Sequence, residues 1–329
     1  MKRVVSEPDT NEAREMRAVY GETLVELARA DERIVVLDAD LMRANGTVVF
    51  KKEFPERAFD IGVAEANMVG IASGLSATGL IPFPATFTCF ASRRVFDQFF
   101  ISANYARQNV KLTGTDPGIA ALLNGGTHMS FEDSGLMRTI PGVTIYEPCD
   151  PVSLSALLHQ AAFKPGSAYL RLHRKQIAPI YASDETFELG KGKVIVEGPD
   201  LAILAIGAIL VPEALRAAEI LERDGVQATV VDMHTLKPID EDLIVSLAET
   251  CGAFVTCENH QIRNGLGSAV AEVLVENKPV PLARVGVHDE FGEVGDMDYL
   301  KNRYGMTAEN IAGQAKLVIR KKERVGVAS

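Results

Sequence analysis

Glu65 is the acidic side chain of this sequence best placed to exchange a proton. It lies in the first turn of a predicted helix, among Val63, Ala64 and Met68. An acidic residue there is also favoured by the positive end of the helix, by about 0.3–1 kcal/mol. A carboxyl held in apolar surroundings instead has a raised pKa and can share a proton with a bound group near neutral pH. The residue types alone leave both interpretations open.

Aromatic, imidazole and basic side chains could complete such a site. Phe87 and Phe90 are three positions apart and could stack on a flat ring or fill the core. His128 follows two glycines, and its imidazole could move protons or simply face solvent. The basic residues that could hold a small anion are Arg171, Arg174 and Lys175.

The elements that must position these groups alternate between strand and helix. We expect helices at 12–29, 64–78, 92–108 and 151–163, and further helices at 212–223, 240–249 and 266–276. We expect strands at 33–40, 83–87, 110–115, 143–146 and 168–173, and further strands at 201–206, 228–231, 254–257 and 282–287. Such alternation predicts parallel sheets with helices on both faces.

The predicted fold class is α/β with two domains, each a mostly parallel sheet flanked by helices. A polar connector at 181–192 separates them, so we place the domains at 1–188 and 189–329. Asp38 and Asp40 end a buried strand at the edge where open α/β sheets bind ligands, although turn chemistry also explains them. The glycine-rich loop at 117–134 is long and aperiodic, which favours a functional role.

Composition excludes several classes of function. The net charge is −10, so the chain lacks the basic surplus needed to neutralise nucleic-acid phosphates or anionic membranes. We expect no membrane span and no secretory signal. The four cysteines show no metal-ligand spacing, which predicts free thiols in a reducing cytoplasm.

The order of motifs resembles the pyrimidine-binding domain of transketolase and its thiamine-diphosphate-dependent relatives. The resemblance extends from about residue 17 to the end of the chain. The matching motifs are Gly62-x-Ala64-Glu65, Gly74-Leu75, Pro82, Thr86-Phe87-x-x-Phe90, Gly126-Thr127-His128, Leu136-Met137-Arg138-x-Ile140-Pro141 and Glu147-Pro148-x-Asp150.

The resemblance implies roles for the residues around the cofactor. Glu65 would hydrogen-bond the pyrimidine of thiamine diphosphate and exchange a proton with it. Phe87 and Phe90 would hold that ring, and Arg93 stands where full-length transketolases carry a third aromatic. His128 would act near the reacting carbon of the substrate. Asp40 would lie near the thiazolium side.

The resemblance also implies where the substrate binds, and this sequence departs from the family there. Arg17 and Arg174 match two arginines that grip the sugar-phosphate tail. Asp116 stands in place of a clamp histidine, Ala44 in place of a clamp serine, and Asn124 in place of an aspartate that contacts a substrate hydroxyl. Ketol-transfer chemistry is therefore expected to persist, with a tail that differs from the usual pentose phosphates.

A separate domain binds the diphosphate and its Mg²⁺ or other divalent cation in the family, through Gly-Asp-Gly followed by Asn, and this sequence lacks it. The resemblance is therefore to the C-terminal half of a transketolase split into two chains. We expect a partner subunit carrying the metal and diphosphate site, no metal site on this chain, and a two-plus-two heterotetramer in the cytoplasm.

Three other interpretations remain. One is the beta subunit of a 2-oxoacid dehydrogenase component, which would require a lipoyl carrier. Another is a relative of 1-deoxyxylulose-phosphate synthase, normally one long chain. The third is a non-catalytic regulatory subunit of the same fold.

Overall fold

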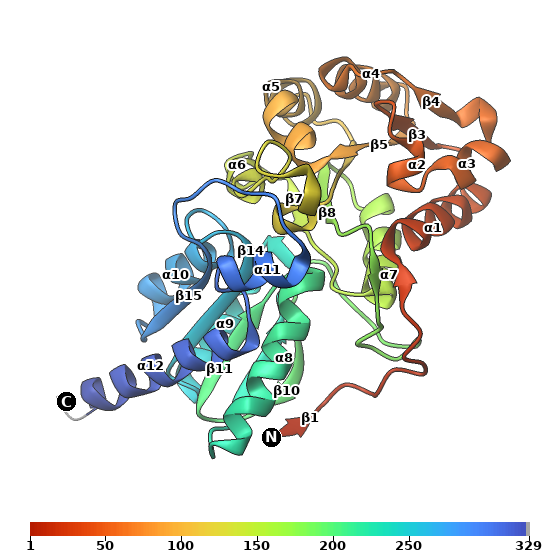
Figure 1. Cartoon of the computed structure of the whole chain (residues 1–329). Coiled ribbons are helices and arrows are strands. Elements are labelled where there is room, and N and C mark those ends of the chain that lie inside the picture. The colour runs from red at the N-terminus through yellow and green to blue at the C-terminus, as the bar shows by residue number, and fades with distance from the viewer. Residues whose placement is uncertain (327–329) are drawn as a thin grey trace.

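The computed structural model describes residues 1–326 as two α/β units packed side by side (Figure 1). The strands of the first sheet are β3 (Ile34–Asp38), β4 (Ala58–Asp60), β5 (Ile81–Phe87), β6 (Lys111–Thr115), β7 (Thr144–Tyr146), β8 (Ala168–Leu172) and β13 (Thr235–Lys237). The strands of the second sheet are β1 (Lys2–Arg3), β10 (Lys193–Glu197), β11 (Leu201–Ala205), β12 (Ala228–Asp232), β14 (Phe254–Gln261) and β15 (Leu282–Val287).

The helices cover the faces of these sheets (Figure 1). In the first unit they are α1 (Met16–Ala30), α2 (Met42–Asn45), α3 (Val48–Glu53), α4 (Glu65–Ala77), α5 (Phe96–Gln98), α6 (Asp133–Arg138) and α7 (Pro151–Phe163). In the second they are α8 (Gly207–Arg223), α9 (Glu241–Thr250), α10 (Leu266–Asn277), α11 (Met297–Arg303) and α12 (Ala308–Gly326).

Both sheets are mostly parallel, which confirms the predicted fold class. The first has the order β13-β7-β8-β6-β5-β3-β4, and only its β13–β7 pair is antiparallel. The second has the order β1-β10-β12-β11-β14-β15, with antiparallel pairing confined to β1, β10 and β12. Its central strand β11 is fully buried, as expected when helices cover both faces.

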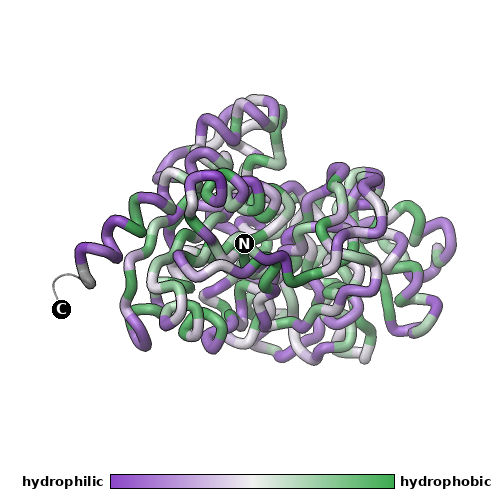
Figure 2. Tube along the Cα trace, turned by 90° about the horizontal axis from the view of Figure 1, so that it is seen from below, coloured by the Kyte–Doolittle hydropathy of each residue, from purple (hydrophilic) through white to green (hydrophobic). Residues whose placement is uncertain are grey.

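Each sheet has one edge strand that comes from a segment of the chain outside its own unit. β1 precedes the whole first unit, yet it pairs with β10 of the second sheet. β13 lies far along the chain, yet it pairs with β7 of the first sheet. Apolar side chains are also shared, because Ile145 and Leu204 belong to one buried cluster. Hydrophobic segments accordingly run through both halves of the molecule (Figure 2).

The helix predicted at 92–108 is interrupted. The chain there forms a π-helix at Phe90–Arg94, the short α5, and a second π-helix at Phe99–Tyr105. Phe99 and Ala103 are still fully buried, so the spacing of the apolar residues correctly predicted which face of this segment is buried. The same spacing does not distinguish an α-helix from the wider turns of a π-helix, which are frequent near functional sites.

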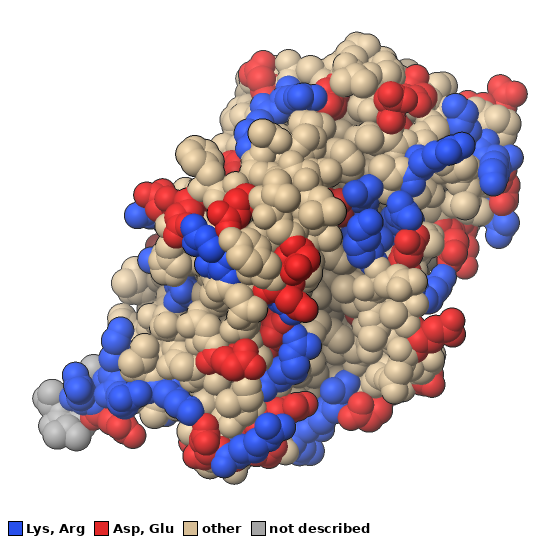
Figure 3. All heavy atoms as spheres, in the orientation of Figure 1, with Lys and Arg blue, Asp and Glu red and all other residues tan. Residues whose placement is uncertain are grey.

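Basic and acidic side chains are interspersed over the face shown in Figure 3. Within residues 1–326, no helix is long and apolar enough to cross a membrane.

The two units are joined by a buried guanidinium. Arg171 of β8 is 1% exposed and donates to Asp133 at 2.7 and 3.1 Å. It also donates to the Glu147 carboxylate and, at 2.9 Å, to the Asn259 backbone carbonyl of β14. Because an unpaired buried charge is strongly destabilising, these acceptors hold the units in one relative placement.

A buried acid links the units a second time. Asp232 ends β12, and its Oδ2 accepts from the Cys149 thiol at 3.1 Å and from the Tyr181 hydroxyl at 3.0 Å. Burial raises the pKa of Asp232 to about 7, although these two donors act in the opposite direction. The folded chain therefore keeps a proton that an unfolded aspartate releases near pH 4.

This proton makes a prediction about stability and pH. The contribution of Asp232 to the free energy of unfolding should fall as the pH rises from about 4 to about 7, and stay flat above. The wild type should therefore lose stability as the pH rises from 5 to 8. Asp232→Asn has no such proton to release, so its loss over the same range should be smaller by on the order of 2 kcal/mol. Chemical unfolding at both values measures it, with the exposed Asp242→Asn as control. Equal pH dependence of Asp232→Asn and wild type would contradict the assignment.

Candidate active site

Three rings from two separate segments meet at the carboxyl edge of the first sheet. Phe87 ends β5, and Phe90 begins the π-helix that follows. Their ring centroids are 6.1 Å apart. The imidazole of His128 lies edge-on to both, at 6.1 Å from Phe87 and 5.4 Å from Phe90. The structure thus brings together three residues that the sequence analysis selected separately.

Glu65 lies at the same place but is not surrounded by apolar groups alone. It begins α4, is 6% exposed, and accepts a hydrogen bond from Arg94 Nη1 at 2.7 Å. The Arg94 guanidinium also lies 3.8 Å above the Phe90 ring. The expected apolar setting is therefore corrected: a half-exposed arginine pairs with the carboxyl and covers one face of Phe90.

Arg93 points the other way along the π-helix. Its guanidinium donates to Glu132 Oε1 at 3.0 Å and to the Thr127 carbonyl at 3.1 Å. Thr127 Oγ1 in turn lies 2.9 Å from His128 Nδ1. Arg93 therefore holds the loop that carries His128, at the rim of the aromatic cluster.

A buried polar network supports the edge of the sheet beneath these groups. Asp38 is 0% exposed and accepts from Asn45 Nδ2 at 2.7 Å and Thr47 Oγ1 at 2.6 Å. Burial raises the pKa of Asp38 to about 7, against the effect of these donors. Asn45 Oδ1 accepts from Thr115 at 2.9 Å, which joins β3 to β6. Asp40 is exposed beside them with φ of 60°, and its backbone N–H donates to Asp60.

The two arginines predicted to grip a substrate tail also come together. β2 (Arg14–Glu15) pairs with β9 (Gln176–Ile177), and the Arg17 backbone N–H donates to the Arg174 carbonyl at 3.3 Å. Arg17 donates twice to Glu15, at 2.9 and 3.0 Å. The Arg174 guanidinium pairs with Asp116, donates to the Ala44 carbonyl at 3.2 Å, and lies 4.9 Å from the Phe87 ring centroid.

The second unit shapes the loop that carries His128. Asn259 Nδ2 donates to the Pro117 carbonyl at 2.8 Å, and its Oδ1 accepts from the Ile119 N–H at 2.9 Å. Gly118 has φ of 53°, and a Cβ there would lie 2.1 Å from the Asn259 oxygen, so only glycine fits. Asn124 is exposed at the end of the 3-10 helix Gly118–Asn124.

Sequence reasoning missed Arg94, Asn259 and His173, of which the last is a buried neighbour of Arg174. Arg94 and Asn259 act through partners 29 and 140 positions away, so no local pattern marks them. Only their residue types could have marked His173 and Asn259, since a histidine or asparagine inside an apolar unit needs a hydrogen-bond partner.

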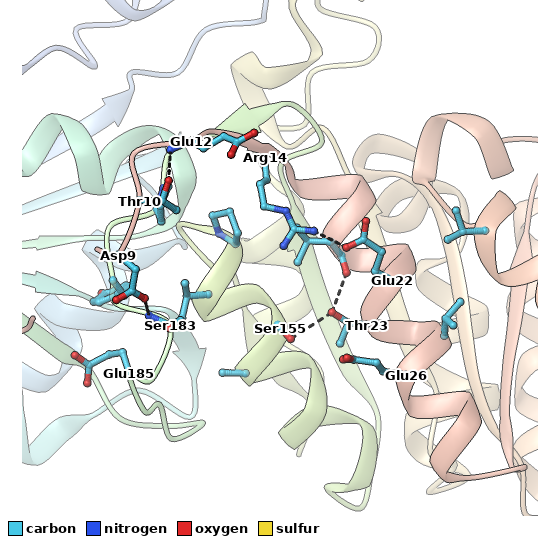
Figure 4. Close-up of a pocket in the computed structure, with 18 of the residues that line it drawn as sticks. Asp9, Thr10, Glu12, Arg14, Glu22, Thr23, Glu26, Ser155, Ser183 and Glu185 are labelled. Atoms are coloured by element: carbon cyan, nitrogen blue, oxygen red, sulfur yellow. Dashed lines mark hydrogen bonds and ion pairs between the residues drawn. The ribbon is translucent and has the colours of Figure 1, made fainter. Parts of the chain in front are cut away.

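A cavity of about 740 Å³ opens elsewhere, between the N-terminal segment, α1 and α7 (Figure 4). None of the predicted site residues lines it. Its charged groups are largely paired, since Arg14 contacts Glu22 at 2.5 Å and Asp9 accepts from the Ser183 N–H at 2.7 Å. We assign no chemistry to it.

Both units match families of known proteins. Residues 12–179 match the model of the transketolase pyrimidine-binding domain, and residues 190–311 match that of the transketolase C-terminal domain. The chain belongs to the transketolase family.

Several relatives are likewise single subunits. The chain is 52% identical to the 6-deoxy-6-sulfo-D-fructose transketolase subunit of a Clostridium species, over 93% of this chain and 95% of that one. It is 36% identical to one of the subunits of the apulose-4-phosphate transketolase of Phocaeicola vulgatus, over 93% and 97%. A solved split-gene transketolase, described as an inactive beta4 tetramer, is 41% identical with a TM-score of 0.86, over 94% of this chain and 100% of that one. This chain thus corresponds to the half of a transketolase that carries the pyrimidine-binding and C-terminal domains.

The family implies thiamine diphosphate, and the residues present fit its pyrimidine ring. Two aromatic faces stand beside a buried carboxyl, which suits stacking on a flat ring and a hydrogen bond to a ring nitrogen. Arg94 spans from Phe90 to Glu65, so the two lie about one guanidinium apart. Among the described residues, no three His, Cys, Asp or Glu side chains gather as a metal site.

The contacts of Arg94 lead to a prediction about cofactor binding. It occupies both the Glu65 carboxyl and the Phe90 face, so a bound pyrimidine ring must displace it. Arg94→Gln should strengthen binding of thiamine diphosphate to the assembled enzyme by roughly 2- to 5-fold, since a half-exposed ion pair is worth about 1 kcal/mol or less. Calorimetry measures the affinity, and Arg93→Gln should weaken it by loosening the His128 loop. Weaker binding by Arg94→Gln would show that Arg94 aids the cofactor instead.

Proposed function

We propose that Glu65, Phe87, Phe90 and His128 are the catalytic and pyrimidine-binding residues of this transketolase subunit. The observation that carries the proposal is the meeting of the three rings beside the buried carboxyl. The reaction transfers a two-carbon ketol unit from a ketose to an aldose acceptor. Thiamine diphosphate supplies the carbon nucleophile that cleaves the ketose.

The residues of this chain prepare and direct that chemistry. Once Arg94 has moved aside, the Glu65 carboxyl exchanges a proton with the pyrimidine nitrogen. Phe87 and Phe90 fix the orientation of the ring. His128 hydrogen-bonds the substrate oxygens and moves their protons, because its ring lies edge-on against the same two aromatic residues.

Two further residues act at the rim of the cofactor site. Arg93 holds the His128 loop in place through Thr127 and Glu132. Asp40, exposed at the carboxyl end of β3, would contact the thiazolium side of the bound cofactor.

A partner subunit completes the enzyme. We place the diphosphate site and its Mg²⁺ or other divalent cation on an N-terminal-half subunit, within a two-plus-two heterotetramer. The split-subunit relatives support this, as does the inactivity of the solved beta4 tetramer. The domain boundary at 188/189 is part of the proposal. So is a cytoplasmic location, which the four free, buried cysteines support.

The substrate is a ketose with an anionic tail other than that of the usual pentose phosphates. Arg17 and Arg174 contact the tail, with Asp116 beside them, and Asn124 contacts a hydroxyl. The names of the relatives support a non-standard sugar, since one acts on a sulfonated fructose and another on apulose 4-phosphate. We propose 6-deoxy-6-sulfofructose as the first donor to test. Turnover of xylulose 5-phosphate at ordinary rates would oppose this choice.

Cofactor binding tests the division between subunits. Thiamine diphosphate with Mg²⁺, titrated by calorimetry, should bind the mixture of this chain with its partner and not this chain alone. The isolated chain offers the pyrimidine contacts without a diphosphate site, so its affinity should be at least about 100-fold lower. Tight binding by this chain alone would overturn the split site.

Replacement of the central acid tests the proposed chemistry. Glu65→Gln keeps the shape of the side chain but cannot exchange a proton, so ketol transfer by the assembled enzyme should fall by about 10²- to 10⁴-fold. Steady-state kinetics measures the loss, and the exposed Glu56→Gln serves as control. Retention of more than a tenth of the activity by Glu65→Gln would remove Glu65 from the mechanism.

A further inference from the structure

Three adjacent polar side chains at the carboxyl edge of the first sheet have atoms without a partner among the described residues. These atoms are Asp116 Oδ1, His173 Nδ1 and Arg174 Nε. The three residues are 4%, 6% and 9% exposed. They follow the neighbouring strands β6 and β8, and the Asp116 N–H donates to the Leu172 carbonyl at 3.0 Å.

Unpartnered buried polar atoms are rare because each costs free energy. Three side by side therefore point to a ligand that supplies their partners, and one of them, Arg174, lies 4.9 Å from the Phe87 ring centroid. Asp116 also has φ of 54°, in the left-handed region that a non-glycine residue rarely adopts. Residues held in such conformations cluster at ligand sites.

The charges around this group nearly cancel. Arg17, Arg174 and Lys175 are positive, whereas Glu15 and Asp116 are negative, which leaves a net charge of +1. His173 adds no charge near neutral pH, because burial lowers its pKa to about 4. Two of the three positive charges are therefore offset within the chain, which favours a singly charged anion over a doubly charged one.

We propose that Asp116, His173 and Arg174 form a tail subsite that selects a sugar with a singly charged sulfonate over one with a doubly charged phosphate. This rests on the proposed function, since the tail belongs to the ketose that the enzyme cleaves. Asp116 and His173 are the specificity-determining residues.

In this subsite each of the three unpartnered atoms hydrogen-bonds the substrate. Arg174 Nε donates to one sulfonate oxygen, and the neutral His173 imidazole donates to another through Nδ1. Asp116 Oδ1 accepts from a neighbouring sugar hydroxyl, while its other oxygen keeps the Arg174 guanidinium in place. A phosphate monoester carries a charge of about −1.5 to −2 at pH 7, so the Asp116 carboxylate repels it more strongly than it repels a sulfonate.

The test uses a matched pair of sugars, 6-deoxy-6-sulfofructose and fructose 6-phosphate, which differ only in the group on C6. Dissociation constants for both are measured with the assembled complex by calorimetry, alongside kcat and KM for each. Wild type should prefer the sulfonate by about tenfold or more. Asp116→Asn removes the repelling charge at constant shape and should reduce this preference to less than about threefold, mainly through KM. Asp116→Glu, which keeps the charge, should retain the preference.

His173 provides a second pair of variants. His173→Leu should weaken sulfonate binding by about tenfold, and His173→Asn should restore most of it, because its amide can donate near the position of Nδ1. If His173 were purely structural, His173→Asn would not restore sulfonate binding. If Asp116 were purely structural, Asp116→Asn would not change the ratio of sulfonate affinity to phosphate affinity.

The outcomes separate the two proposals. A wild type that binds phosphate at least as tightly as sulfonate overturns the subsite, and so does a ratio unchanged in Asp116→Asn. Because binding is measured independently of turnover, a complex that shows the predicted ratios but transfers no ketol unit supports the subsite and contradicts the proposed function.

Discussion

The buried guanidinium of Arg171 is the constraint on which the rest of the structure depends. A charge that is 1% exposed is tolerated only where its hydrogen bonds are satisfied, and the acceptors here come from both units. Asp133 and Glu147 belong to the first unit, whereas the Asn259 carbonyl belongs to β14 of the second. Separating the units would leave this charge short of an acceptor. The exchange of β1 and β13 between the sheets reinforces the same arrangement.

This docking determines the shape of the His128 loop. Asn259 accepts and donates within the segment that starts the loop, and Gly126 lies so close to the Gly292 carbonyl that a Cβ would come within 2.2 Å of it. Up to residue 326, the second unit contributes no ring to the aromatic cluster, yet it fixes the loop from which His128 approaches Phe87 and Phe90. The sequence analysis selected the loop residues, but the restraint on them comes from β14 and the segment after β15.

The charged groups of the site are paired within the chain. Glu65 is held by Arg94, Arg174 by Asp116, and Arg17 by Glu15. Pairing lowers the cost of a charge in a partly desolvated place, and it also means that a ligand must compete with an internal partner. The same pairing keeps these charges satisfied when no ligand is bound. The unpartnered atoms of Asp116, His173 and Arg174 are the exception.

The sequence by itself determined the fold class, the family and the side chains that meet at the sheet edge. Alternating buried strands and amphipathic helices are local patterns, and a parallel sheet places the ends of its strands at one edge. The motifs that resemble those of the transketolase family were what selected Phe87, Phe90 and His128 without coordinates. Only the tertiary structure decided which charges pair, that Arg94 contacts Glu65, that Asn259 restrains the loop, and that π-helical turns replace a regular helix. Periodicity reports which face of an element is buried, but it carries no information about the distant partner that a buried polar group requires.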